Sequence, residues 1–170
     1  LFRSSAHLPD SGARWADGWK FALPVTLFET VGIARRGEPV DVAVVFPADE
    51  VDDPAREVRV AQVNAQSGVL REVRSQVYGE TRRGSRRYCN LVFLADVPLH
   101  DRADYLIFYG NPNAALPAYS SDLTTTGEDY GLDIENAHFV ARLSRQMGQL
   151  ERLTYKREHG LELYAGGKGH

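Results

Sequence analysis

Four arginines that lie close together in the sequence are the side chains best suited to bind a charged ligand: Arg82, Arg83, Arg86 and Arg87. A guanidinium can donate two parallel hydrogen bonds to a carboxylate, so this cluster could recognise an acidic polysaccharide. The acidic segment 49–57 could instead be its partner within the fold. Runs of charge more often face water than a ligand. The sequence therefore leaves both interpretations open.

Two tryptophans and one histidine extend this candidate ligand-binding set. Trp15 and Trp19 interrupt a polar N-terminal stretch. They either anchor that stretch to a core or an interface, or offer a platform for sugar rings, because an indole face covers apolar surface well. Anchoring is the commoner role of large aromatic side chains. His170 follows the glycine-rich stretch 166–169, whose backbone could come close to a ligand.

No catalytic residue can be assigned from the sequence. The chain has neither a GxSxG motif nor a strict phosphate-binding loop, and its five histidines lack the i, i+4 spacing of a helical metal site. Asp133 and Glu135 would lie about 7 Å apart on one strand face, as in inverting glycosidases but also as on the wet face of any strand. Cys89 has no base near it in sequence and is expected in the core. The chain alone is not expected to be active, and neither a metal nor a cofactor is expected.

Composition limits the class of partner. The chain has 170 residues and a net charge of -3, which argues against nucleic acid or an anionic membrane as the main partner. No apolar run approaches the roughly 20 residues that span a bilayer as a helix. Apolar residues make up 43% of the chain, which is enough to build a core.

Apolar residues recur at every second position along much of the chain. The even-numbered residues from Val40 to Phe46 would share one buried strand face by this pattern. About ten such short segments alternate with turn signals, which is typical of an antiparallel β-sandwich or barrel. Residues 35–39 are expected to form a turn and residues 48–57 a solvated loop. The sequence therefore predicts an all-β fold.

Changes in composition divide the chain into four segments. Residues 1–20 are expected to form an N-terminal arm, and residues 21–117 a β-sandwich domain. Residues 118–129 are polar and are expected to form a connector. Strand-like alternation resumes after them, so residues 130–170 are expected to be the first strands of a second β unit.

Three stretches resemble parts of carbohydrate-active enzymes. Residues 32–40 (GIARRGEPV) with residues 44–47 (VVFP) look like the opening of N-terminal β modules in bacterial and fungal polysaccharide lyases, such as the exo-acting rhamnogalacturonan lyase group. Residues 105–114 (YLIFYGNPNA) are similar to the terminal strand of β-sandwich modules on secreted glycan-degrading proteins. Residues 132–150 resemble the first hairpin of the large β-sandwich in many sugar-processing enzymes.

This resemblance implies the N-terminal, non-catalytic or cleft-wall portion of a polysaccharide lyase or glycoside hydrolase, with a lyase of acidic glycans favoured. It implies that the catalyst lies in the remainder of the same polypeptide or in a second subunit, and that the protein is extracellular or periplasmic. It carries over no catalytic residue, because the matching positions are turn and core residues. A carbohydrate-binding or assembly module without catalysis is the alternative.

Overall fold

The structure is a computed structural model that describes residues 16–156 and 160–165. The chain divides into two compact units, which we call unit 1 (residues 1–118) and unit 2 (residues 119–170). Two members of the candidate ligand-binding set, Trp15 and His170, lie outside the described residues. Within the described part of the chain, no helix is long and apolar enough to cross a membrane.

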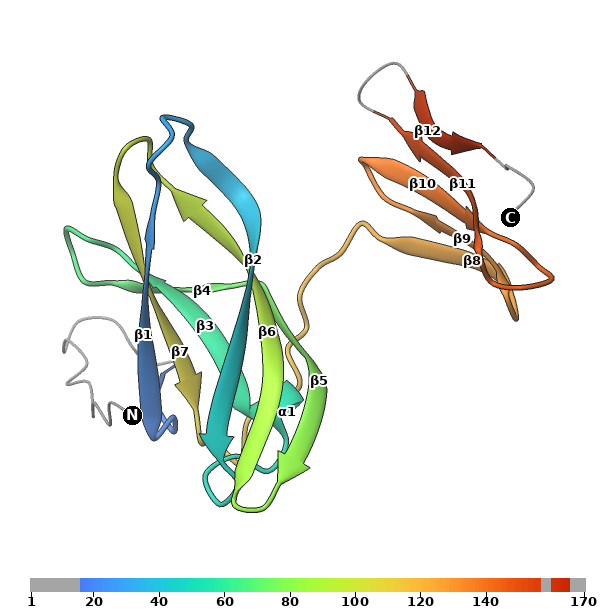
Figure 1. Ribbon diagram of the computed structural model, residues 1–170. Helices are drawn as coiled ribbons and strands as arrows, with labels where there is room; N and C mark the ends of the chain where they lie inside the picture. The colour runs from blue at the N-terminus through green and yellow to red at the C-terminus, as the bar shows by residue number, and fades with distance from the viewer. Residues whose placement is uncertain (1–15, 157–159, 166–170) are drawn as a thin grey trace. The chain divides into compact units, whose positions relative to one another are not determined.

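Unit 1 contains two antiparallel sheets (Figure 1). The four-stranded sheet has, in spatial order, β1 (Phe21–Phe28), β7 (Arg102–Tyr109), β3 (Val58–Val63) and β4 (Leu70–Val73). The three-stranded sheet has β2 (Arg35–Pro47), β6 (Arg86–Val97) and β5 (Ser75–Arg83), with β6 in the centre. One short helix, α1 (Pro54–Glu57), precedes β3. The prediction of an antiparallel all-β fold is therefore confirmed.

The core of unit 1 lies between these two sheets. Phe46 of β2 and Leu91 and Phe93 of β6 pack with Tyr105 and Ile107 of β7, and all five side chains are buried. The rings of Phe93 and Tyr105 lie 5.2 Å apart, centroid to centroid. Each buried side chain of this size contributes about 1.5–3 kcal/mol through removal of apolar surface from water. The period-two pattern predicted for residues 40–46 thus places one face of β2 against the core.

Two segments of unit 1 differ from the sequence expectation. Residues 35–39 were expected to form a turn, but β2 already begins at Arg35 and pairs with β6 up to Val97. A bulge shifts the register of the pairing between Arg35 and Glu38, and Gly37 within it has a φ of 58°. A bulge of this kind lets a strand continue through a local turn signal. The segment 48–57 is also not wholly a loop, because it ends in α1.

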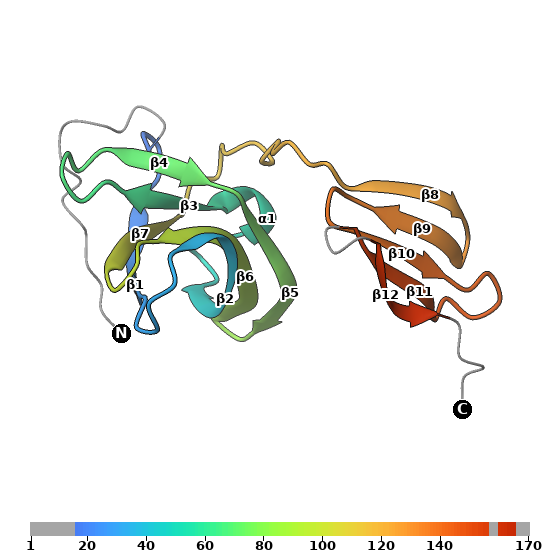
Figure 2. The same cartoon turned by 90° about the horizontal axis from the view of Figure 1, so that it is seen from above.

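Unit 2 is one five-stranded antiparallel meander (Figure 2). Its strands follow one another in space as they do in sequence: β8 (Thr124–Glu128), β9 (Gly131–Glu135), β10 (Phe139–Leu143), β11 (Leu150–Tyr155) and β12 (Leu161–Ala165). Residues 124–128 were expected within the connector, yet they form β8 because Thr124 to Glu128 pair with β9 across a tight turn. Its threonines suit an edge strand.

Candidate functional site

The outer face of the three-stranded sheet is open to solvent over much of its area. Strand pairing puts the even-numbered residues of β6 on this face, since Cys89, Leu91 and Phe93 point to the core. We call the surface the Tyr88 face. It is made of these residues: Asp41, Ala43 and Val45 of β2; Arg86, Tyr88 and Asn90 of β6; and Tyr78 and Arg83 of β5. All of them are exposed except Asn90, which is half-buried.

An arginine and a tyrosine form the centre of the Tyr88 face. The Cζ atom of Arg83 lies 5.8 Å from the centre of the Tyr88 ring, within the range of a cation–π contact. The contact leaves the Tyr88 residue 38% exposed. Arg86 pairs directly with Arg83 across the β5–β6 hairpin, so both guanidinium groups emerge on the same face. Two cations thus flank an accessible aromatic ring.

Tyr78 extends this aromatic surface across the sheet. Its hydroxyl donates a hydrogen bond to Asp41 Oδ2 on β2, although β6 separates the two strands. Two strand spacings amount to about 10 Å, so the Tyr78 side chain has to lie across the central strand. The hydrogen bond to Asp41 and partial desolvation raise the pKa of the Tyr78 phenol. A bulge at Gly79 and Glu80 separates Tyr78 from the pairing of Thr81 with Tyr88.

The structure splits the predicted arginine cluster between two faces. Arg83 and Arg86 lie on the Tyr88 face, whereas Arg82 and Arg87 form the neighbouring pair of the hairpin and project to the other side of the sheet. The hairpin turns at residues 84 and 85. Two of the four arginines are therefore placed with the tyrosines, and two are not.

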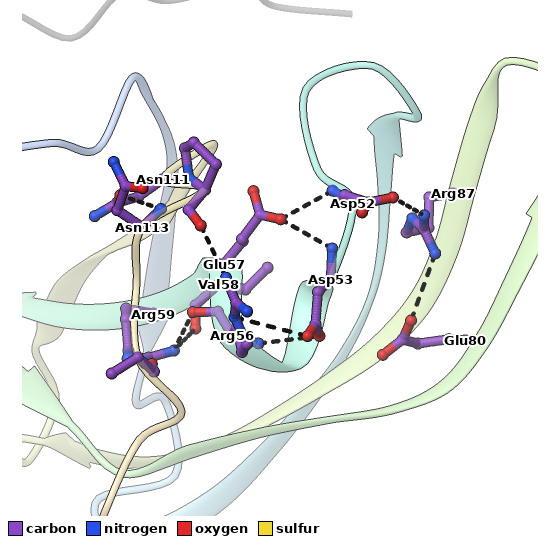
Figure 3. A network of polar contacts seen from close by, with 12 residues as sticks. Asp52, Asp53, Arg56, Glu57, Val58, Arg59, Glu80, Arg87, Asn111 and Asn113 are labelled. Atoms are coloured by element: carbon purple, nitrogen blue, oxygen red, sulfur yellow. Dashed lines mark hydrogen bonds and ion pairs between the residues drawn. The ribbon is translucent and has the colours of Figure 1, made fainter.

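Arg87 is held within the fold (Figure 3). Its side chain is 14% exposed, and its guanidinium lies 3.4 Å from Asp52 Oδ1 and 3.7 Å from Glu80 Oε2. Its Nε donates a hydrogen bond of 3.0 Å to the carbonyl oxygen of Val51. The acidic segment 49–57 thus supplies two of the partners of this one arginine, Asp52 and Val51, as one of the two interpretations of the sequence expected. The contacts fix the segment over the end of the sandwich.

Trp19 lies on the opposite side of unit 1 from the Tyr88 face. It packs edge-on against Phe108 of β7, with ring centroids 6.5 Å apart, and Phe108 points away from the core between the sheets. The guanidinium of Arg59 lies 5.7 Å from the centre of the Trp19 ring. Trp19 thus covers the outer face of the four-stranded sheet, and the structure does not bring it to the predicted arginines.

A hollow in unit 1 does not offer a better site among the described residues. It has a volume of about 690 Å³ and lies beside Arg71, Arg102 and Asp104. Its charges already have partners, because Arg71 contacts Asp96 at 3.2 Å and Arg102 contacts Asp104 at 3.9 Å. The Tyr88 face, in contrast, combines exposed cations with aromatic rings.

The two carboxylates considered for catalysis form ion pairs, and the thiol is buried. Asp133 accepts two hydrogen bonds from Arg142, of 2.8 and 2.9 Å, and this pairing lowers the Asp133 pKa. Glu135 is paired with Lys156 at 2.5 Å. Burial raises the pKa of the Cys89 thiol to about 11, with a smaller contribution from Glu80. No cluster of metal-ligating side chains occurs among the described residues.

The sequence reasoning missed Asp41, Tyr78 and Tyr88. The signal for Tyr88 was present, since its neighbours Cys89 and Leu91 to Phe93 show the alternation of a half-buried strand. Comparison with known proteins adds nothing to the assignment: no family model matches the chain, and no significant match was found to a curated protein or to a solved structure.

Proposed function

We propose that this chain is the non-catalytic, glycan-binding portion of a carbohydrate-active enzyme, a polysaccharide lyase that acts on an acidic glycan. The observation that carries the proposal is the Tyr88 face, where Arg83 and Arg86 flank an exposed tyrosine on an open sheet surface. Guanidinium groups pair with carboxylates, and an aromatic ring accepts the apolar face of a sugar while its hydroxyl stays in water. The resemblance of residues 32–47 and 105–114 to modules of such enzymes supports the same function.

The combination of cations and aromatic rings on this face suits a uronate polymer. Such a chain alternates flat apolar ring faces with carboxylates, and the Tyr88 face offers aromatic rings beside cations. In a lyase, neutralising the carboxylate makes the adjacent C5 proton easier for a base to remove. We assign no base to this chain, so its role is to bind the polymer and to form one wall of the cleft. The base belongs to the remainder of the enzyme.

The test is binding of polygalacturonate and alginate by the 170-residue chain, measured by isothermal titration calorimetry. Fully methyl-esterified pectin serves as the neutral polymer. Loss of one charge-assisted hydrogen bond costs about 1.5–3 kcal/mol, so Arg83→Ala and Arg86→Ala should each weaken binding about tenfold or more. Tyr88→Ala should weaken it as well, and binding should fall as salt rises.

Arg36→Ala is the matched control, because Arg36 is exposed on β2 at the end away from the pairing of Val45 with Tyr88. It removes the same charge and should leave binding unchanged. Binding that survives Tyr88→Ala and Arg83→Ala would place the glycan elsewhere on the chain. Absence of binding to every acidic polymer would reject the function itself.

A second function, assembly with another protein, is favoured by one loop cluster in unit 1. Phe28, Val31, Ile33 and Leu99 are all more than half exposed. The buried Glu29 fixes their loops, since its carboxylate accepts N–H groups of Val31 and Gly32 at 2.9 Å and of His100 at 3.0 Å. An apolar cluster on rigid loops is typical of a contact surface. Binding of the purified chain to a partner that Val31→Ser abolishes would support this function over glycan binding.

A further inference from the structure

Among the residues that the structure describes, one face of the sheet in unit 2 carries no charged side chain. The pairings place these residues on it, and we call it the apolar face: Thr125, Gly127, Leu132, Ile134, Phe139, Ala141, Leu143, Leu150, Leu153, Tyr155 and Leu161. Ala141 lies near its centre, directly between Ile134 of β9 and Leu153 of β11. A sheet with one such face needs a second layer to remove it from water.

The opposite face of the same sheet is charged and internally paired. Arg142 with Asp133, Arg152 with Glu162 and Lys156 with Glu135 form its ion pairs, with closest approaches of 2.8, 2.6 and 2.5 Å. This face therefore suits water. Segregation of charge to one side leaves the apolar face as the side that a protein layer covers.

Unit 2 itself supplies no such layer among its described residues. Its five strands form a single sheet, and none of its side chains with an assigned exposure is buried. Even Ile134, Phe139 and Leu153, in the middle of the apolar face, are only half-buried. A surface of this kind without a covering layer marks an interaction site.

We propose that the apolar face packs against the apolar face of a second copy of this chain, so that two five-stranded sheets form a sandwich around a two-fold axis. The occupant has to be free of charge over this footprint, and the face itself meets that condition, so self-pairing brings no like charges together. A two-fold contact uses the same patch on both copies. The proposal is independent of glycan binding by the Tyr88 face.

The size of the face sets the expected strength of the dimer. Five strands at about 4.8 Å and five residues at about 3.3 Å give a footprint of about 400 Å² per copy. Two copies together bury about 800 Å², which is less than the roughly 1,200–2,000 Å² of stable specific interfaces and is typical of weak, transient contacts. We therefore expect a weak dimer that dissociates in the micromolar range rather than a permanent one.

The test is sedimentation velocity of the 170-residue chain over a concentration range from about 1 to 200 µM, chosen to bracket a micromolar equilibrium. Wild type should shift from monomer to dimer. Ala141→Lys should weaken the dimer about 100-fold or more, because each ammonium group would lose its water within an apolar layer. Thr154→Lys is the matched control: it adds the same charge on the opposite face, beside Glu162, and should leave the dimer intact.

Leu161→Lys is the second variant, for the case that circular dichroism shows Ala141→Lys to be unfolded. Leu161 lies on the edge strand β12 and is 51% exposed, so the monomer loses little when it is replaced. It should weaken the dimer about tenfold or more. A wild-type chain that stays monomeric throughout overturns the proposal and points to a different polypeptide as the second layer. A dimer that survives both variants overturns it as well, since the contact then lies elsewhere.

Discussion

Replacement of Arg87 by alanine should destabilise unit 1 without affecting ligand binding. The buried Val51, 1% exposed, would lose the donor to its carbonyl oxygen, and an unsatisfied buried acceptor costs about 1–3 kcal/mol. The ion pairs add less, because Asp52 is almost fully exposed and such pairs contribute at most about 1 kcal/mol. Together the loss should be about 1–4 kcal/mol.

Tryptophan fluorescence is the assay, because both tryptophans of the chain, Trp15 and Trp19, belong to the segment before β1. Trp19 packs on Phe108 of β7, so its emission reports the unfolding of unit 1. For a unit of 118 residues, a loss of this size lowers the melting temperature by about 10 °C. Arg86→Ala is the control, since an exposed side chain without these contacts should change stability by at most about 0.5 kcal/mol.

Equal melting temperatures for Arg87→Ala and Arg86→Ala would refute the reasoning, because they would show that the contacts to Val51 and Asp52 contribute nothing. Binding of polygalacturonate, measured by calorimetry, should distinguish the two variants in the opposite direction. Arg86→Ala should lose affinity, and Arg87→Ala should retain it at a temperature where the protein is folded.

Two further predictions follow from perturbed ionisable groups. Burial raises the pKa of Glu29, but N–H donors of His100, Val31, Ile33 and Gly32 outweigh it and hold the pKa at about 2, below its ordinary 4.5. The stabilisation by the Glu29 carboxylate is therefore complete above pH 4.5 and is lost as the pH falls towards 2. Urea denaturation should show that the difference in free energy of unfolding between wild type and Glu29→Gln becomes smaller over that pH range. A difference that stays constant would contradict the prediction. Cys89, with its pKa raised to about 11, should react with a disulfide reagent at pH 8 about 100-fold more slowly than in the unfolded chain; equal rates would show an accessible thiolate.

The alternation of apolar residues was sufficient to predict a strand where one face of that strand is buried. The alternation from Val40 to Phe46 predicted its inward face, because burial against the core selects every second residue. The same reasoning failed at residues 35–39, where glycine and proline indicate a turn but pairing with β6 extends the strand. It also failed at β8, whose residues are all exposed and which pairs with β9. The pairing of residues 35–39 with β6 joins distant parts of the chain and has no local signature, whereas the polar composition of β8 concealed a local hairpin with β9.

The candidate site was partly predictable for a related reason. Composition alone grouped Arg82, Arg83, Arg86 and Arg87, but only the hairpin register decides which two share a face. The proximity of Tyr78 to this face depends on the bulge at Gly79, which shifts the register between β5 and β6. The sequence therefore predicted a group of neighbouring cations, and the hairpin register decides which of them share a face.

Strand alternation also predicts which substitutions along β6 should affect stability and which should affect ligand binding. Arg86, Tyr88 and Asn90 face outward, whereas Arg87 and Cys89 face the interior of the fold. Because adjacent residues of one strand belong to different environments, inward positions should alter stability by about 1–4 kcal/mol, with little direct effect on a ligand. Outward positions should alter binding with little effect on stability. The inward side chains of β6 thus fix the backbone under Tyr88 before a ligand binds. Less conformational entropy is therefore lost when the Tyr88 face binds its ligand.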